Sequence, residues 1–403
     1  MEIEGRLTIT LNREGARVTG VAIESSRPLQ AARIFEGRTP DEVLRLLPRL
    51  YSVCGTAQAA AASRALAGAL GVAPAADVTA ARLLLVWLET AREHLWRILL
   101  DWPEFLEEAP ATGPAASLSR LLPEAGRALF GDGDGFALAS KTHPDRSALH
   151  ALVSDLESVA EAAVFGCSPS AWVDEKNPAS LEGWMDEGAT IAARLLRRVR
   201  DRGWADAGGA QVAFLPALQE AALDRRLSAD EAEQFIAEPE WMGAVAETTP
   251  LARQRNQTLV RALRLQYGNG LLPRLAARLV ELATILERLR ALLETIESAG
   301  DAGAGDRGVE DKGGTGQGAG KGVGLGQVEA ARGRLVHRVE LDNGLVRCYQ
   351  ILAPTEWNFH PRGVVALGLL RLEARDEAQL QRQAALLINA VDPCVGYELT
   401  VTG

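Results

Sequence analysis

A leucine seam near residue 280 is the feature that most restricts what this chain can fold into. Between residues 271 and 297, apolar side chains recur at alternating steps of four and three residues: Leu275, Leu279, Leu282, Leu286, Leu289, Leu293 and Ile296. This a/d spacing predicts a long amphipathic helix. The seam is compatible with a coiled coil that binds a partner. Packing against the chain's own helices is the simpler interpretation.

The remaining pattern is mostly helical, with short strands near both ends of the chain. Residues 79–298 follow helical periodicity almost throughout. Two pairs of alternating segments, each around a turn, predict β-hairpins: 7–11 with 18–23, and 333–341 with 345–352. The sequence therefore predicts a mainly α fold with small β-hairpins.

Helix boundaries near the N-terminus carry their own signals. Thr39 and Glu42 are spaced as a capping box, which predicts the start of a helix, and Pro48 is expected to end it. An alanine-rich helix is predicted next, over residues 57–70. The loop between these two helices carries Cys54.

Glycine is concentrated in one segment between the two halves of the chain. Twelve of the 28 residues from 299 to 326 are glycine, and so much backbone freedom disfavours helix and strand. We predict three parts. Residues 1–298 hold the N-terminal hairpin, the Cys54 motif and the helical body; 299–328 form a flexible linker; and 329–403 pack with the N-terminal part as one domain.

Charge and hydropathy exclude several classes of partner. The net charge of −10 argues against binding to nucleic acid or to an anionic membrane. No apolar stretch approaches the roughly 20 residues of a membrane span, and the N-terminal residues do not resemble a signal peptide. With only four cysteines, the expected location is the reducing cytoplasm.

Two of the four cysteines are candidates for metal binding. The chain has no CxxC, HExxH or GxSxG motif. Cys54 and Cys394 each lie at the end of a segment, and the helix that follows Cys54 is expected to stabilise its thiolate, the form that binds soft metals. Cys167 and Cys348 are expected to be small core residues, and His94 a packed core histidine.

Four blocks of the chain resemble motifs of the nickel–iron hydrogenase large subunit. Residues 49–58 resemble R-x-C-G-x-C-x-x-x-H, 322–333 resemble G-x-G-x-x-E-A-P-R-G, 349–362 resemble V-P-T-T-W-N-x-x-P-R-D, and 392–397 resemble D-P-C-x-x-C. The blocks follow the family's order. More specifically, the motifs resemble those of the maturation proteins of the HupK/HoxV type. The resemblance implies a helical body like that of the large subunit.

The departures from these motifs bear on activity. Tyr51 and Tyr397 stand where the hydrogenase motifs have cysteine, and Gln58 stands where the first motif has histidine. Two of four thiolate ligands are therefore missing, and a neutral tyrosine is a poor ligand for a soft cation. The resemblance thus implies a degenerate large subunit that binds no nickel and is not an enzyme.

The remaining motif residues imply a carrier of the iron half of the hydrogenase cofactor. Cys54 and Cys394 would bind an Fe(CN)2CO fragment transiently, and Pro361 and Arg362 would face its cyanide ligands. The two cysteines are the second of one pair and the first of the other. Either the iron lies nearer the nickel position, or Cys54 alone binds it.

The expected function is a non-catalytic scaffold that delivers this fragment to the hydrogenase large subunit. The implied partners are assembly chaperones of the HypC type and the large-subunit precursor. The alternative is a metal-free binding module or chaperone, which docks assembly factors or protects the precursor in oxygen. In that case both cysteines would be dispensable.

Overall fold

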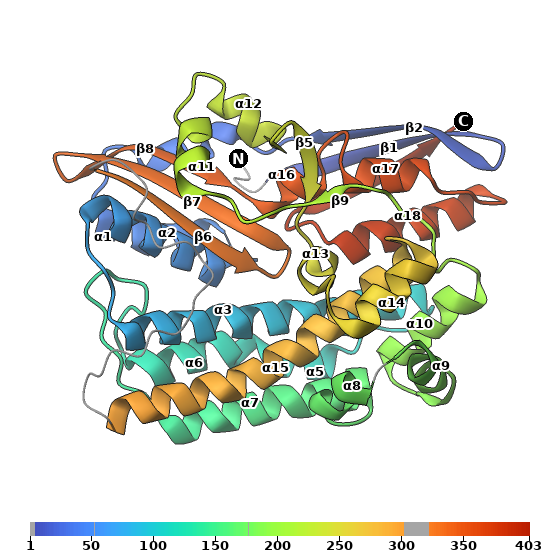
Figure 1. Ribbon diagram of the computed structural model, residues 1–403, viewed down its shortest axis with the longest axis horizontal. Coiled ribbons are helices and arrows are strands. Elements are labelled where there is room, and N and C mark those ends of the chain that lie inside the picture. Colours follow the sequence, from blue (N-terminus) through green and yellow to red (C-terminus); the bar gives the residue numbers. More distant parts are fainter. Residues whose placement is uncertain (1–4, 52, 176, 302–321) are drawn as a thin grey trace.

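The computed structural model describes residues 5–51, 53–175, 177–301 and 322–403, most of them helical (Figure 1). Within these ranges, no helix combines the length and the apolar character needed to cross a membrane. The helices, with short 3-10 and π segments as η, are α1 (Pro40–Leu50), α2 (Gly55–Leu70), α3 (Ala76–Trp96), α4 (Trp102–Phe105), α5 (Thr112–Ser117), α6 (Leu121–Phe130), α7 (Arg146–Ala160), α8 (Pro169–Glu175), α9 (Pro178–Glu187), α10 (Ile191–Asp201), α11 (Glu220–Leu227), α12 (Ala232–Ala237), α13 (Pro250–Gln254), α14 (Thr258–Tyr267), α15 (Leu271–Asp301), α16 (Pro354–Asn358), α17 (Val364–Leu370), α18 (Glu377–Val391), η1 (Leu29–Phe35), η2 (Arg97–Asp101), η3 (Leu118–Arg120) and η4 (Glu161–Phe165).

The strands form small three-stranded sheets, which lie above the long helices in Figure 1. In the described ranges the strand orders are β2-β1-β9, β3-β5-β4 and β6-β7-β8. The expected mainly α fold with small sheets is confirmed. The strands are β1 (Arg6–Glu14), β2 (Arg17–Ser25), β3 (Ala213–Phe214), β4 (Glu240–Trp241), β5 (Ala244–Glu247), β6 (Val323–Ala330), β7 (Gly333–Asp342), β8 (Leu345–Leu352) and β9 (Gly396–Thr402).

The leucine seam packs inside the molecule. All of its side chains are buried, the most exposed being Ile296 at 6%. Helix α15 runs across the body beside α3 and α7 and also contacts α8, α13 and α14 (Figure 1). The intramolecular interpretation is confirmed.

Buried ion pairs fix α15 from its polar side. The Arg274 guanidinium donates to both carboxylate oxygens of Glu247, at 2.7 and 3.1 Å. The Arg253 Nε donates to Glu281 at 2.6 Å, and His94 Nε2 lies 2.8 Å from the same carboxylate. His94 is therefore the packed core histidine that the sequence predicts.

The two ends of the chain meet in one sheet. Strand β9 pairs in parallel with β1, so that Leu7 lies opposite Tyr397, while β2 pairs with β1 on the other side as the predicted hairpin. Strand β9 is not among the strands that the sequence predicts. Its pairing holds the segment after Cys394 beside the N-terminal hairpin.

The predicted linker at 299–328 is wrong at both ends. Helix α15 continues to Asp301, and residues 323–330 form strand β6; residues 302–321 lie outside the described residues. Glycine allows close packing in β6, because a Cβ on Gly324 or Gly326 would lie within 2 Å of a carbonyl oxygen of α2. Strand β6 therefore lies directly against the helix that begins after Cys54.

The capping box at Thr39 is confirmed, but Pro48 does not end the helix. The Thr39 N–H donates to Glu42 Oε2 at 2.8 Å, and Thr39 Oγ1 accepts from the Glu42 N–H. Helix α1 continues past Pro48 to Leu50, and the Tyr51 N–H then donates to the Leu47 carbonyl at 3.3 Å. Pro48 removes only the hydrogen bond from its own position to the Leu44 carbonyl, and α1 continues for two residues beyond it.

Candidate functional site

Cys54 and Cys394 line the same small pocket, although 339 positions separate them in the chain. Cys54 is the N-cap residue of α2, and its carbonyl accepts from the Gln58 N–H at 2.9 Å. Cys394 lies between the end of α18 and the start of β9. The pairing of β9 with β1 and the packing of β6 on α2 bring the two segments together.

The pocket walls combine the two thiols with one cation and apolar side chains. It holds about 280 Å³ of space between atoms, part of it open to solvent. Its other lining residues come from α2, from β6, β7 and the turn between them, and from the start of α16: Gln58, Ala330, Ala331, Arg332, Leu335, Ala353 and Pro354.

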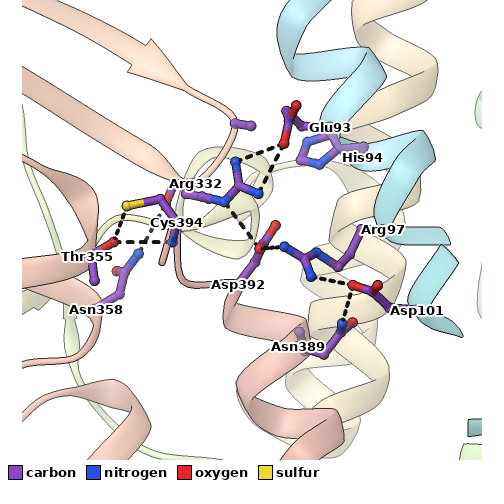
Figure 2. Close-up of polar contacts among 12 residues, drawn as sticks. Glu93, His94, Arg97, Asp101, Arg332, Thr355, Asn358, Asn389, Asp392 and Cys394 are labelled. Carbon is purple, nitrogen blue, oxygen red and sulfur yellow. Dashed lines mark hydrogen bonds and ion pairs between the residues drawn. The ribbon is translucent and has the colours of Figure 1, made fainter. Parts of the chain in front are cut away.

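Arg332 is the guanidinium of this pocket, and its side chain is only 4% exposed. Its Nη1 and Nη2 atoms each donate to Glu93 Oε2 at 3.1 Å, and its Nε donates to Asp392 Oδ1 at 3.2 Å. Figure 2 shows Arg332 between these two carboxylates, with the Cys394 thiol to one side. Burial alone would lower the pKa of Arg332. The carboxylates of Asp392 and Glu93 outweigh burial and raise the pKa above its ordinary value, so the guanidinium stays charged.

Asp392 accepts hydrogen bonds from three arginines at the end of α18. Besides Arg332, it accepts from Arg97 at 2.6 Å (Figure 2). It also accepts from Arg278 at 3.1 Å, and its side chain is 1% exposed. Burial alone would raise the pKa of this carboxyl. The guanidinium of Arg332, followed by those of Arg97 and Arg278, instead holds the pKa well below its ordinary value. A charged Asp392 therefore fixes the residue two positions before Cys394.

Each thiol lies beside a polar side chain. Cys394 Sγ and Thr355 Oγ1 lie 2.9 Å apart, within hydrogen-bond distance (Figure 2). Gln58 Nε2 donates to Cys54 Sγ at 3.6 Å, and Gln58 Oε1 lies 2.7 Å from His337 Nε2. Gln58 thus orients its amide nitrogen toward the thiol while a buried histidine holds its oxygen.

The expected helix stabilisation of the Cys54 thiolate is wrong. The Cys54 side chain makes no capping hydrogen bond to α2. Burial, with smaller contributions from Cys394 and Glu89, raises the pKa of the thiol well above its ordinary value. The N–H groups at the start of α2 are taken by Glu89, which accepts from Thr56 at 2.8 Å and from Ala57 at 2.9 Å.

Arg362 and Pro361 do not face the pocket, so this sequence expectation is wrong. Both residues are exposed, and Arg362, 68% exposed, pairs with Glu240 of β4. The loop is anchored by the residues before them, since Trp357 and Asn358 are buried in and after the first turn of α16. The chain then emerges to the surface.

Asn358 of the same motif acts on the pocket indirectly. Its Nδ2 donates to the Arg332 carbonyl at 3.1 Å and to the Thr248 carbonyl at 3.2 Å, while its Oδ1 accepts from the Thr248 N–H at 2.9 Å. One buried amide therefore positions the backbone of Arg332. A signal for Arg332 was present in the sequence, because the block at 322–333 that resembles G-x-G-x-x-E-A-P-R-G ends in an arginine and a glycine.

Tyr51 and Tyr397 lie outside the lining of the pocket in the described structure. Tyr51 is 4% exposed and packs in an apolar cluster, with the Arg27 guanidinium 5.9 Å from its ring centroid. Tyr397 is 37% exposed on β9. Neither phenol replaces a sulfur at this pocket.

The other two cysteines also lie away from it. Cys167 and Cys348 are half-buried, so the expectation that they are core residues holds only in part. Across the described ranges, no group of three or more cysteine, histidine, aspartate or glutamate side chains is arranged to hold a metal. The pocket therefore offers two thiols and a guanidinium.

Comparisons with known proteins match a family model in part of the chain and relatives over 98% of it. The family model for nickel-dependent hydrogenase matches residues 210–365. The hydrogenase expression/formation protein HoxV of Cupriavidus necator is 34% identical over 98% of this chain and 95% of its own length. The hydrogenase expression/formation protein HupK of Rhizobium leguminosarum is 30% identical over 98% and 96%.

A solved structure supports the same fold. The nickel–iron–selenium hydrogenase of D. vulgaris Hildenborough, in its reduced state, superposes with a TM-score of 0.67 and 17% identity, covering 95% of this chain and 94% of that one. The hydrogenase-like helical body that the sequence motifs imply is thereby confirmed.

Proposed function

Because the chain belongs to the family of hydrogenase expression/formation proteins that includes HoxV and HupK, we propose that it is a non-catalytic scaffold in nickel–iron hydrogenase maturation. It carries an Fe(CN)2CO fragment as cargo and delivers it to the hydrogenase large subunit. The observation that supports this proposal best is the meeting of Cys54, Cys394 and Arg332 at one pocket.

The chemistry of the pocket matches such a cargo. Thiolates are soft ligands for iron, and the free energy of iron–sulfur bonding drives release of the thiol proton from Cys54 although burial raises its pKa. Three of the five N–H groups of Arg332 donate to Glu93 and Asp392, which leaves two for an anionic acceptor such as cyanide. Alanine, leucine and proline side chains limit water around it.

The donor set also favours a carrier over an enzyme. Two sulfurs at the pocket are half of the four that the hydrogenase motifs supply. A two-thiol site holds iron without completing a nickel site, so the cargo remains transferable. We place this step in the cytoplasm, where free thiols persist, with HypC-type chaperones as donors and the large-subunit precursor as acceptor.

Infrared spectroscopy of protein purified without oxygen from its native host tests the proposal. The wild type should show bands of iron-bound cyanide and CO and should contain iron but no nickel. Cys54→Ala should lose the bands, and so should Cys394→Ala unless Cys54 alone binds the iron. Cys348→Ala is the matched control, because Cys348 is a half-buried thiol outside the pocket, and it should keep the bands.

Two other outcomes would contradict the proposed iron site. Bands that survive in both pocket variants would assign the cargo to another site. A wild type without bands, which nevertheless co-purifies with the hydrogenase precursor and supports its maturation when both cysteines are replaced, would establish the metal-free docking module instead.

A further inference from the structure

A second feature lies at the opposite end of α18 from the pocket. Two adjoining hollows share Asp201 and Arg202 and together form one groove between the end of α10, the segment after α4 and the start of α18. We call it the arginine groove after its six arginines: Arg194, Arg197, Arg198, Arg202, Arg375 and Arg382.

The groove is positive although the protein is acidic. Six guanidinium groups line it against three carboxylates, those of Glu108, Asp201 and Asp376, while the whole chain has a net charge of −10. All three carboxylates are already engaged, and Glu108 pairs with Arg194 inside the groove, so Arg194 is neutralised. Asp376 accepts from the Gln379 N–H at 2.8 Å as the cap of α18, and Asp201 pairs at 2.8 Å with Arg200, which does not line the groove.

The groove arginines are incompletely neutralised. Glu107 is the shared counter-charge of Arg198, Arg202 and Arg382, at 3.6, 4.0 and 3.6 Å, all longer than a normal hydrogen bond. Within the described residues, Arg197 donates to two backbone carbonyls, those of Met185 and Asp186, and to no carboxylate. In the described part of the chain, no carboxylate is paired with the Arg375 guanidinium.

We propose that the arginine groove docks an acidic segment of a partner protein. Guanidinium groups bind carboxylates through paired hydrogen bonds, so unpaired N–H groups in a row favour aspartate or glutamate side chains. Two adjoining hollows suit an extended peptide better than a single small anion. The largely buried Leu106 and Trp204 form part of the floor, and the Arg202 guanidinium lies 4.9 Å from the Trp204 ring centroid.

The position of the groove leaves the cysteine pocket accessible. Helix α18 begins beside the groove and ends at Val391, directly before Asp392, and its 15 residues span about 22 Å. In Figure 1, α10 and α18 lie at the same end of the molecule. A partner held at the groove is therefore close to the pocket without covering it, and this inference does not depend on the identity of the cargo.

Binding of a synthetic peptide to the full-length protein tests the groove. The probe is a short fluorescein-labelled peptide of alternating glutamate and alanine, and the glutamine–alanine peptide is its neutral counterpart. Fluorescence anisotropy should show saturable binding of the acidic peptide alone, and its affinity should fall as salt is added. Arg202→Gln with Arg382→Gln should weaken binding by about tenfold or more.

The matched control is Arg17→Gln with Arg347→Gln, which removes the same charge from two exposed arginines outside the groove. It should change binding less than about twofold. Arg375→Gln, which breaks no ion pair in the described residues, should weaken binding without affecting the fold. The proposal is overturned by equal weakening in the control, by equal binding of the neutral peptide or of oligothymidylate, or by complete displacement with inorganic phosphate.

Discussion

The Arg332 guanidinium donates to Asp392 at 3.2 Å, and this bond ties the turn between β6 and β7 to the end of α18. Arg332 lines the cysteine pocket, and Asp392 lies two positions before Cys394. The same carboxylate also binds Arg97 and Arg278. The relative position of the two thiols therefore depends on one buried aspartate.

Replacing this carboxylate should destabilise the protein strongly. Asp392→Asn leaves the buried guanidinium groups of Arg278 and Arg332, and the half-buried one of Arg97, without their shared charge, which should lower the free energy of unfolding by about 3–5 kcal/mol. Guanidinium chloride unfolding followed by circular dichroism measures the effect. Asp376→Asn, at the other end of α18, is the control, because asparagine is an equally good N-cap. An unchanged midpoint for Asp392→Asn would contradict this prediction.

Asn358→Asp tests whether the buried amide positions Arg332. The carboxylate cannot donate to the carbonyls of Arg332 and Thr248, and it places a charge in an interior site that is 1% exposed. We expect a loss of about 3 kcal/mol or more in unfolding free energy, measured by urea titration. Asn343→Asp should cost little, since aspartate before glycine also forms the β7–β8 turn. Equal stability of the two variants would exclude the assigned role of Asn358.

The glycines of β6 should respond oppositely to a glycine in a helix. Gly326→Ala places a Cβ 1.9 Å from the Ala61 carbonyl oxygen, so β6 must move away from α2. We expect a loss of about 4 kcal/mol or more, or failure to fold. Gly126→Ala in α6 meets no atom within 4 Å and should stabilise by about 0.5–1 kcal/mol. Thermal unfolding of the two variants compares them directly, and a mild effect at Gly326 would contradict the packing of β6.

Local signals in the sequence predict much of this fold. The seam of α15, the capping box at Thr39 and the Asp342-Asn343-Gly344 turn each act within a few residues, and each is confirmed. Strand β9 was missed because its partner β1 lies almost the whole chain away, and no local pattern reports such a pairing. The glycines of β6 suggest a flexible backbone in the sequence, whereas in the structure they allow close contact between β6 and α2.

The same contrast applies to the site. Motif positions identified Cys54 and Cys394, and the fold brings them to one pocket. A motif does not give the direction of a side chain. The motif therefore predicts Arg362 at the site, whereas in the structure Arg362 is exposed and Arg332 lines the pocket. The position of Cys54 before a helix suggested a stabilised thiolate, but burial dominates there and Glu89 accepts from the N–H groups.

Glu281 should make the stability of the fold depend on pH under acidic conditions. Burial would raise the pKa of Glu281, but Arg253, followed by His94, holds it well below its ordinary value of 4.5. A carboxyl with a lowered folded-state pKa stabilises the fold at pH values above 4.5. That stability is lost as the pH falls further, because the unfolded chain then binds the proton first. The contribution changes by about 1.4 kcal/mol per pH unit in this range.

Glu281→Gln should therefore be less stable than the wild type at pH 7, and the difference should shrink steadily below pH 4.5. Unfolding free energies from urea titrations at several pH values measure the two slopes. Glu373→Gln removes an exposed carboxylate paired with Arg17 and should follow the wild type throughout. A gap between Glu281→Gln and the wild type that stays constant with pH would mean that Glu281 is not held ionised by Arg253.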